Sequence, residues 1–258
     1  MQLYCPICQS ELFKKEKSFQ CANKHLFDQS KHGYLNLYVK NSSKSPGDDK
    51  IMVQARSSFL AKGYYDHLKT AVNDIIRDIN PYNLVDLACG EGYYTKDFPC
   101  LDVVGVDLSK DAIIFASKQD KKTQYLIASI FTLPLASSST SLVTTLFAPV
   151  ALKEIERILI PGGYFLLVSV GEDHLYELKK FIYDIPYKND ELHVDTSLTI
   201  IKQVQLKQSI TIQSYADIQD LFMMTPYYYK TSPQDKSKLD LLDQMELVVH
   251  FTITLYKK

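Results

Sequence analysis

The 258-residue sequence lacks an apolar run long enough to cross a bilayer, and no basic segment leads into an apolar stretch near its start. It also lacks internal repeats and low-complexity segments. Its five cysteines are an odd number, which in a chain without a secretion signal argues against a disulfide framework. We therefore expect a soluble, cytoplasmic protein with no membrane partner, built as one large domain or as one domain plus a small module.

Three of the cysteines form a pattern with a histidine near the start of the chain, C-x2-C-x12-C-x3-H. Zinc prefers a closed tetrahedron of thiolate and imidazole ligands, and a two-residue spacer lets one tight turn present two sulfurs to one ion. Four protein ligands leave no open position for catalysis. We therefore predict a structural Zn²⁺ site rather than a chance group of reduced thiols. Its ligands are Cys5, Cys8, Cys21 and His25.

Charge is distributed unevenly along the chain. Residues 1–44 contain seven lysines and three acidic side chains, whereas the whole chain has a net charge of -1. This segment stays positive after three thiolates and one Zn²⁺ ion are counted. A basic module on an acidic body favours a nucleic-acid contact, although charge alone fits a solvated face equally well.

The pattern of apolar residues predicts an α/β protein. Valine-, leucine- and isoleucine-rich runs without strict alternation indicate strands buried on both faces, as in a parallel sheet flanked by helices. Helical spacing predicts helices over 51–60 and 65–79 and from Lys110 onward, with Ser109 as the N-cap. Two late β-like stretches, 198–212 and 247–256, are expected to form a terminal antiparallel hairpin. The five predicted parallel strands cover residues 84–88, 103–107, 124–128, 142–147 and 163–169.

A glycine loop follows the first of these strands. Gly90 and Gly92 leave room where the backbone turns sharply and approaches a ligand. Asp107 ends the next strand, where a carboxylate accepts both ribose hydroxyls of an adenosine. Asp86 could hold a methionine amino group, directly or through water, and Glu91 adds a second anion near a sulfonium.

The loop favours S-adenosylmethionine (SAM) over a dinucleotide. Gly90 and Gly92 are followed by Thr95, where the dinucleotide pattern has its third glycine. SAM has no pyrophosphate and does not need that glycine. A nicotinamide or flavin cofactor, or a turn that only requires glycine, remains the alternative. The expected fold is thus a class I (Rossmann-like) SAM-dependent methyltransferase sheet with an N-terminal zinc-ribbon module.

The chain resembles the bacterial 23S rRNA (guanine-N1)-methyltransferases of the RlmA type. The order and spacing of several short motifs carry the resemblance through nearly the whole chain. Besides the zinc pattern and the glycine loop, they are Phe27-Asp28, Lys31-x-Gly33-Tyr34-x-Asn36-Leu37, Pro46-Gly47-Asp48, Met52-x-x-Ala55-Arg56-x-x-Phe59-Leu60-x-x-Gly63-x-Tyr65, Ala148-Pro149, His174-Leu175-x-Glu177-Leu178-Lys179 and Met224-Thr225-Pro226. Ala88 stands where the family usually has the first glycine of the loop.

The resemblance implies methyl transfer from SAM to N1 of a guanine in a hairpin of domain II of 23S rRNA, by a homodimer whose zinc module grips the RNA. Residues 41–49 are polar and rich in helix-breaking residues, which indicates a linker. The expected segments are a zinc-binding RNA-recognition module at 1–38, a linker and connecting helix at 39–62, and the methyltransferase domain at 63–258. Because the chain has no tryptophan, base stacking falls to tyrosine and phenylalanine. The implied cofactor contacts are Tyr65, Gly90, Glu91, Asp107 and His174.

No catalytic residue follows from the sequence. His174 is favoured as a cofactor contact over a general base, and Arg56 either holds a phosphate or pins the connecting helix. The tyrosines at 227–229 either stack on a base or fill the core, and Ala148-Pro149 is expected near the acceptor. Two other functions stay open: a SAM-dependent methyltransferase acting on another RNA or a small molecule, and a zinc-dependent RNA-binding protein without turnover.

Overall fold

The computed structural model describes residues 1–39 and 47–258. Most of the polar linker expected at 41–49, including Lys44 and Pro46, therefore lies outside the described residues, as does Lys40. The boundaries drawn after residues 38 and 62 remain a prediction. None of the described helices is long and apolar enough to span a bilayer.

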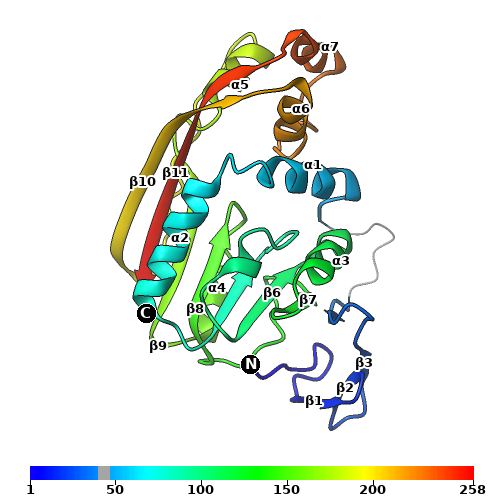
Figure 1. Ribbon diagram of the computed structural model, residues 1–258. Coiled ribbons are helices and arrows are strands. Elements are labelled where there is room, and N and C mark those ends of the chain that lie inside the picture. Colours follow the sequence, from blue (N-terminus) through cyan, green and yellow to red (C-terminus); the bar gives the residue numbers. More distant parts are fainter. Residues whose placement is uncertain (40–46) are drawn as a thin grey trace.

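The main sheet has eight strands in the order β10-β11-β9-β8-β5-β6-β7-β4 (Figure 1). Strands β5 to β9 run parallel to one another, which confirms the five predicted parallel strands. Chain order reverses at β5, whose neighbours are β6 and β8, so the loop after β5 lies at the topological switch point. The strands are β4 (Leu35–Asn36), β5 (Leu84–Leu87), β6 (Val103–Asp107), β7 (Gln124–Ile127), β8 (Thr140–Leu146), β9 (Leu159–Val170), β10 (Thr199–Ile212) and β11 (Met245–Lys257).

Four of the helices in the described residues, α1, α3, α6 and α7, begin after a residue whose side chain caps the first turn. Ser109 accepts a hydrogen bond from the backbone N–H of Ala112, as expected for the N-cap of α3, and Asp49 caps α1 in the same way. The helices predicted at 51–60 and 65–79 are confirmed as α1 and α2. The helices are α1 (Lys50–Leu60), α2 (Asp66–Ile79), α3 (Lys110–Gln119), α4 (Leu152–Ile158), α5 (Tyr176–Ile182), α6 (Tyr215–Met223) and α7 (Pro233–Ser237).

Alternate residues of the parallel strands enter two different cores. Leu84 of β5 belongs to the same hydrophobic core as residues of α2, α5 and α6, whereas the next residue, Val85, belongs to the core on the other face, with residues of α4. That second face is also covered by the N-terminal segment, because Leu3 and Leu12 belong to the same core as Val85. Both faces of the parallel strands are therefore buried, which explains the continuous apolar runs in the sequence.

The N-terminal segment forms a small sheet of β1 (Leu12–Lys15), β2 (Ser18–Cys21) and β3 (Leu26–Asp28). Two strand-like backbone pairings, among other contacts, attach it to the main domain. Leu3 forms a bridge with Leu135, and β4 adds a parallel strand to the edge of the main sheet, beside β7. This attachment was not predicted. In Figure 1 the small sheet lies at one corner of the molecule, next to β7 and α3.

The late β stretches pair as predicted, but their connection is longer than that of a hairpin. Strand β10 runs antiparallel to β11 from Thr199 opposite Lys257 to Ile212 opposite Met245. Between the two strands the chain forms α6 and α7, and α6 packs beside α1 (Figure 1). Helix α1 is thereby held over the carboxyl ends of the parallel strands, where the glycine loop lies.

Candidate cofactor and metal sites

The glycine loop after β5 leaves open space at one position and none at another. Gly90 has φ +55°, and a Cβ atom there would have only a guanidinium nitrogen of Arg56 within 4 Å, at 3.4 Å. Gly92 has φ +77°, and its Cβ would lie 2.6 Å from the hydroxyl of Tyr125. A side chain at Gly92 would disrupt the packing, whereas the space beside Gly90 is available to a ligand.

Asp107 ends β6 and faces this loop. Its Oδ2 accepts the backbone N–H of Gly90 at 2.9 Å, and its Oδ1 accepts the backbone N–H of Ser109 at 2.7 Å. Burial raises the pKa of this carboxyl, while the two backbone donors lower it. A carboxylate offers about four acceptor positions, so two remain for ribose hydroxyls. The arrangement fits the predicted role.

Asp86 is buried in β5 and is already hydrogen-bonded within the protein. Its oxygens accept the hydroxyls of Thr95 at 2.5 Å and Thr144 at 2.7 Å. Burial raises the pKa of Asp86 to about 6. These bonds tie β5 to β8 and to the start of the turn after the glycine loop. Asp86 is therefore the least direct of the predicted cofactor contacts.

The structure brings Tyr65 and His174 together, although they are far apart in sequence. Their ring centroids lie 6.2 Å apart, and Phe251 of β11 packs against both. Tyr65 precedes α2 and is buried, and His174 follows β9. Among the residues the structure describes, the hydroxyls of Tyr65 and Tyr94 are buried without a hydrogen-bond partner. Buried polar atoms nearly always have partners, so these hydroxyls fit a polar ligand.

The hydrogen bonds of His174 fix its chemical form. Its Nδ1 accepts the backbone N–H of His250 at 3.2 Å, so the ring proton lies on Nε2. Burial lowers the pKa of His174 to about 3, which keeps the ring neutral at physiological pH. Nε2–H is a donor and Nδ1 is already engaged. His174 is thus suited to donate a hydrogen bond to a ligand and not to accept a proton.

Two residues that the sequence argument left open or overlooked complete this site. Arg56 of α1 forms ion pairs with Asp48 at 2.5 Å and with Glu91 of the glycine loop at 3.3 Å. Tyr94, to which the sequence assigned no role, has a buried hydroxyl without a partner among the described residues, as Tyr65 does. Its only sequence signal was an aromatic pair directly after the glycine loop. Arg56, in contrast, reaches the loop from a position 35 residues away from Glu91.

The residues present therefore fit SAM in their chemistry. Asp107 offers acceptors for ribose hydroxyls, and Gly90 leaves room for the ligand. The unpartnered hydroxyls of Tyr65 and Tyr94 and the Nε2–H of His174 suit a zwitterionic amino-acid portion.

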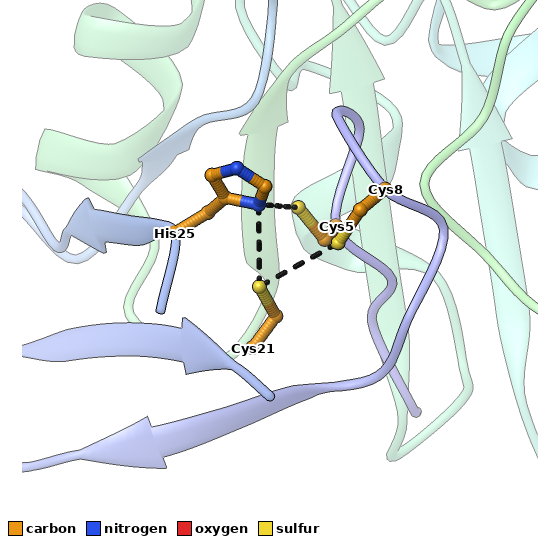
Figure 2. A group of neighbouring side chains, drawn as sticks. All are labelled: Cys5, Cys8, Cys21 and His25. Atoms are coloured by element: carbon orange, nitrogen blue, oxygen red, sulfur yellow. Dashed lines mark hydrogen bonds between the residues drawn. The ribbon is translucent and has the colours of Figure 1, made fainter. Parts of the chain in front are cut away.

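The four predicted metal ligands converge on one point (Figure 2). Their ligand atoms all lie within 4.8 Å of one another. The Nδ1 of His25 is 3.5 Å from the sulfur of Cys5 and 3.4 Å from that of Cys21, and the sulfurs of Cys8 and Cys21 are 3.6 Å apart. A zinc tetrahedron with bonds of about 2.0–2.3 Å has edges of about 3.5–3.8 Å. The group therefore has the size of a zinc site.

The environment of the cluster favours the thiolate form of Cys8, whereas burial raises the pKa of the Cys5 thiol. Hydrogen bonding to the Ser10 hydroxyl, 3.1 Å from the Cys8 sulfur, lowers the pKa of this thiol to about 5. Cys5 and Cys21 are buried, so the ion would be shielded on one side. The two cysteines outside the cluster differ, because burial raises the pKa of both Cys89 and Cys100. Both thiols therefore stay protonated at neutral pH.

An exposed aromatic ring lies next to the cofactor residues. Phe147 directly follows β8, has φ +57°, and remains 42% exposed. Its ring centroid is 5.4 Å from that of Phe251, which also contacts Tyr65 and His174. A bulky residue in the left-handed region is rare and is often found at functional sites. Ala148-Pro149, predicted to lie near the acceptor, comes next in the chain, but Phe147 itself was not singled out from the sequence.

The tyrosines at 227–229 do not form a continuous wall. Tyr227 and Tyr228 pack against the core, and the Tyr227 hydroxyl donates to the side chain of Asn189. Tyr229 is exposed and donates to Asp49 at the start of α1. Core packing thus accounts for two of the three residues.

A basic hollow of about 240 Å³ lies between the N-terminal segment and the main domain. Lys14 of β1 and His32 line it from one side, and Lys121 and Lys122, after α3, line it from the other. Asp120 is the acidic residue in its lining. Burial is the main cause that lowers the pKa of His32. The positive charge of nearby lysines lowers this pKa further.

Comparisons with known proteins agree with a zinc ribbon and a methyltransferase domain. The family described as "RlmA, N-terminal", a zinc ribbon, matches residues 3–44, and a methyltransferase-domain family matches residues 85–167. The "23S rRNA (guanine(748)-N(1))-methyltransferase" of Streptomyces fradiae is 32% identical over 68% of this chain and 66% of its own length. The "putative 23S rRNA (guanine-N(1)-)-methyltransferase YxjB" of Bacillus subtilis is 29% identical over 94% of this chain and 91% of its own length.

Among solved structures, the YcgJ protein of Bacillus subtilis matches 74% of this chain and 98% of its own, with a TM-score of 0.51 and 16% identity. At this level of identity the match shows the fold alone.

Proposed function

The chain belongs to the RlmA-type 23S rRNA (guanine-N1)-methyltransferase family, and from this we propose that it methylates N1 of one guanine in a hairpin of domain II of 23S rRNA. The observation that carries the proposal is the combination, in one chain, of the zinc-ribbon match with a SAM-type glycine loop. The YxjB relative, aligned over most of both chains, supports the acceptor. The zinc ion is structural.

We assign cofactor binding to residues around the switch point of the sheet. SAM supplies an electrophilic methyl group when it is bound. Asp107 would accept the ribose hydroxyls, and Gly90 and Gly92 would let the backbone approach. Tyr65, Tyr94 and His174 would contact the amino-acid portion of SAM, and Glu91 would lie near its sulfonium. Asp86 would support the loop through its hydrogen bonds with Thr95 and Thr144.

Guanine N1 carries a proton at neutral pH, so its attack requires that proton to leave. Most of the acceleration can come from holding N1 in line behind the methyl group. His174 is not a base for this proton, because its Nδ1 is engaged and its pKa is low. The N1 proton would pass to solvent water, and the residues of this chain would contribute by orienting the base.

We propose Phe147 as the platform on which the acceptor guanine stacks. The ring is exposed, while its neighbour Phe251 contacts two cofactor residues. A base that leaves its own stack loses a few kcal/mol, and an aromatic platform returns about 1–3 kcal/mol. Ala148-Pro149 would line the same side of the acceptor.

We further propose that the N-terminal zinc module holds the RNA through the basic hollow at its junction with the main domain. Lys14, Lys121 and Lys122 provide positive charge from both sides of that junction. An enzyme acting on a small molecule would have no use for this hollow.

We also propose that the protein acts as a homodimer, which light scattering of the purified protein would test directly.

The experiment is methyl transfer from labelled SAM to unmodified 23S rRNA, mapped by primer extension, because N1 methylation blocks base pairing and stops the polymerase. We expect one stop, at a guanine in domain II. Asp107→Ala should weaken SAM binding by about 1.5–3 kcal/mol, as for a lost charge-assisted hydrogen bond, and abolish the stop at low SAM. Phe147→Ala should lower kcat and keep SAM affinity. Labelling without a stop would contradict N1 as the acceptor atom.

A further inference from the structure

Arg56 connects two carboxylates that belong to different parts of the chain. One of its guanidinium nitrogens pairs with Asp48, just before α1, at 2.5 Å. The other pairs with Glu91 in the glycine loop at 3.3 Å. The Glu91 side chain is 4% exposed, so its charge depends on this partner. The two-pronged shape of arginine allows one side chain to serve both carboxylates.

These ion pairs form part of a closed ring of polar contacts. The Ser109 hydroxyl donates to the backbone carbonyl of Asp48 at 2.6 Å, and the Ser109 N–H donates to Asp107. Asp107 accepts the N–H of Gly90, and the next residue, Glu91, returns to Arg56. The ring therefore joins the segment before α1, the glycine loop and the start of α3 around the carboxylate of Asp107.

Close packing fixes the segment before α1 in this ring. Gly47 has φ +87°, and a Cβ atom there would lie 2.9 Å from the backbone nitrogen of Ser109. Only glycine allows the chain to pass so close to the N-terminus of α3. Tyr229 donates a hydrogen bond to Asp49 on the other side of the segment. The segment 47–49 is thus seated between α3 and the region after α6.

We propose that Arg56 is a positioning residue: together with Asp48 it clamps the glycine loop in the shape that binds SAM, so that cofactor affinity depends on the seating of residues 47–56. This rests on the proposed cofactor contacts at Gly90, Glu91 and Asp107. Arg56 then neither holds an RNA phosphate nor merely anchors its helix. It acts on the cofactor through Glu91 and through the ring around Asp107.

The test is SAM binding by the full-length protein, measured by calorimetry without RNA. Arg56→Gln should weaken SAM binding at least tenfold. Arg56→Lys should restore part of that loss, because an ammonium cannot bridge both carboxylates. Asp48→Asn should weaken binding severalfold, and the double variant Asp48→Asn/Arg56→Gln should bind no more weakly than Arg56→Gln alone. Arg77→Gln, which removes an exposed pair with Asp74, is the control and should bind SAM as the parent does.

Loss of stability must be separated from loss of positioning. Arg56→Gln leaves a buried charge on Glu91, whereas Arg56→Gln/Glu91→Gln does not. The double variant should recover the melting temperature but not SAM affinity. In turnover, Arg56→Lys should raise the KM for SAM and leave the KM for rRNA unchanged.

The proposal is overturned if folded Arg56→Gln binds SAM with the parental Kd, or if the effects of Asp48→Asn and Arg56→Gln simply add. A parent protein that bound no SAM would overturn this proposal and the proposed function together. A parent that bound SAM but left 23S rRNA unmethylated would overturn only the acceptor, and the variants would still decide the role of Arg56.

Discussion

Ala88 occupies a backbone conformation that suits glycine. Its φ is +55°, in the left-handed region, at the point where β5 turns into the glycine loop. The left-handed conformation destabilises an L-residue in the folded state by about 1–2 kcal/mol, and glycine removes this strain. Glycine also raises the entropy of the unfolded chain, which offsets about 0.4–1 kcal/mol of that gain. We therefore expect Ala88→Gly to raise the free energy of unfolding by about 0.5–1 kcal/mol, as measured by urea denaturation.

The same substitution in a helix provides the control for Ala88→Gly. Ala55 lies inside α1, where glycine is unfavourable, so Ala55→Gly should lower stability by about 1 kcal/mol or more. Equal losses of stability in both variants would show that Ala88 is not strained.

Asp86 makes the stability of the protein depend on pH. Burial raises its pKa from 3.8 to about 6, so the folded protein keeps the proton at pH values where the unfolded chain has released it. The resulting stabilisation is complete below about pH 4 and is lost as the pH rises through 6. Asparagine does not titrate. The unfolding free energy of Asp86→Asn relative to the parent should rise by about 2–3 kcal/mol between pH 4 and pH 7. A constant difference across this range would contradict the pKa shift.

Single residues also show where sequence reasoning ends. Asp107, Gly90 and Gly92 were predictable because a strand end or a tight turn accepts few residue types, and both features are visible in the neighbouring sequence. Arg56 was singled out, but its partner Glu91 lies 35 positions away in the sequence. Phe147 shows its role only through its exposure and its contact with Phe251, and neither is encoded in the neighbouring residues.

At the scale of elements, the sequence predicts best where burial imposes a period. The strands of the parallel core and helices α1, α2 and α3 followed from apolar runs, helical spacing and a capping serine. Strand β4 did not, because two residues carry no period. Its place in the sheet depends on a neighbour, β7, that lies far along the chain. Helices α6 and α7 in the connection between β10 and β11 were not predicted, because the pattern of two strands does not indicate the structure of the segment between them.

The metal cluster is the element whose removal should have the most local effect. Cys21→Ser should abolish the one zinc ion per chain that we expect, measured by elemental analysis, because the remaining ligands no longer complete a thiolate-rich tetrahedron. SAM affinity should change less than twofold, because the cofactor residues lie at the carboxyl ends of β5 and β6. Affinity for 23S rRNA should fall at least tenfold.

The control for Cys21→Ser is Cys100→Ser, which alters a cysteine outside the cluster and should retain zinc. Unchanged rRNA affinity in zinc-free Cys21→Ser would contradict the proposed role of the module in gripping RNA.

At the scale of the whole molecule, the basic hollow predicts a salt dependence. Each lysine that neutralises a phosphate contributes about 0.7–0.9 to the slope of log affinity against log salt. Lys14→Gln/Lys122→Gln should therefore lower the slope for rRNA binding by about 1.4–1.8. The control is Lys202→Gln/Lys257→Gln, on exposed residues of β10 and β11 at the opposite side of the sheet. Equal slopes for both pairs would contradict RNA binding in the hollow.

The pairing of β4 with β7 has a consequence for how the protein is made. The zinc ligands all lie within the first 25 residues, so they can assemble as soon as that segment leaves the ribosome. The apolar residues that cover them, such as Leu126 and Leu135, are synthesised about a hundred residues later. During this interval β7, the strand with which β4 pairs in the main sheet, does not yet exist. Since domains generally fold in order of synthesis, the metal ion would hold the N-terminal segment in shape until its hydrophobic cover arrives.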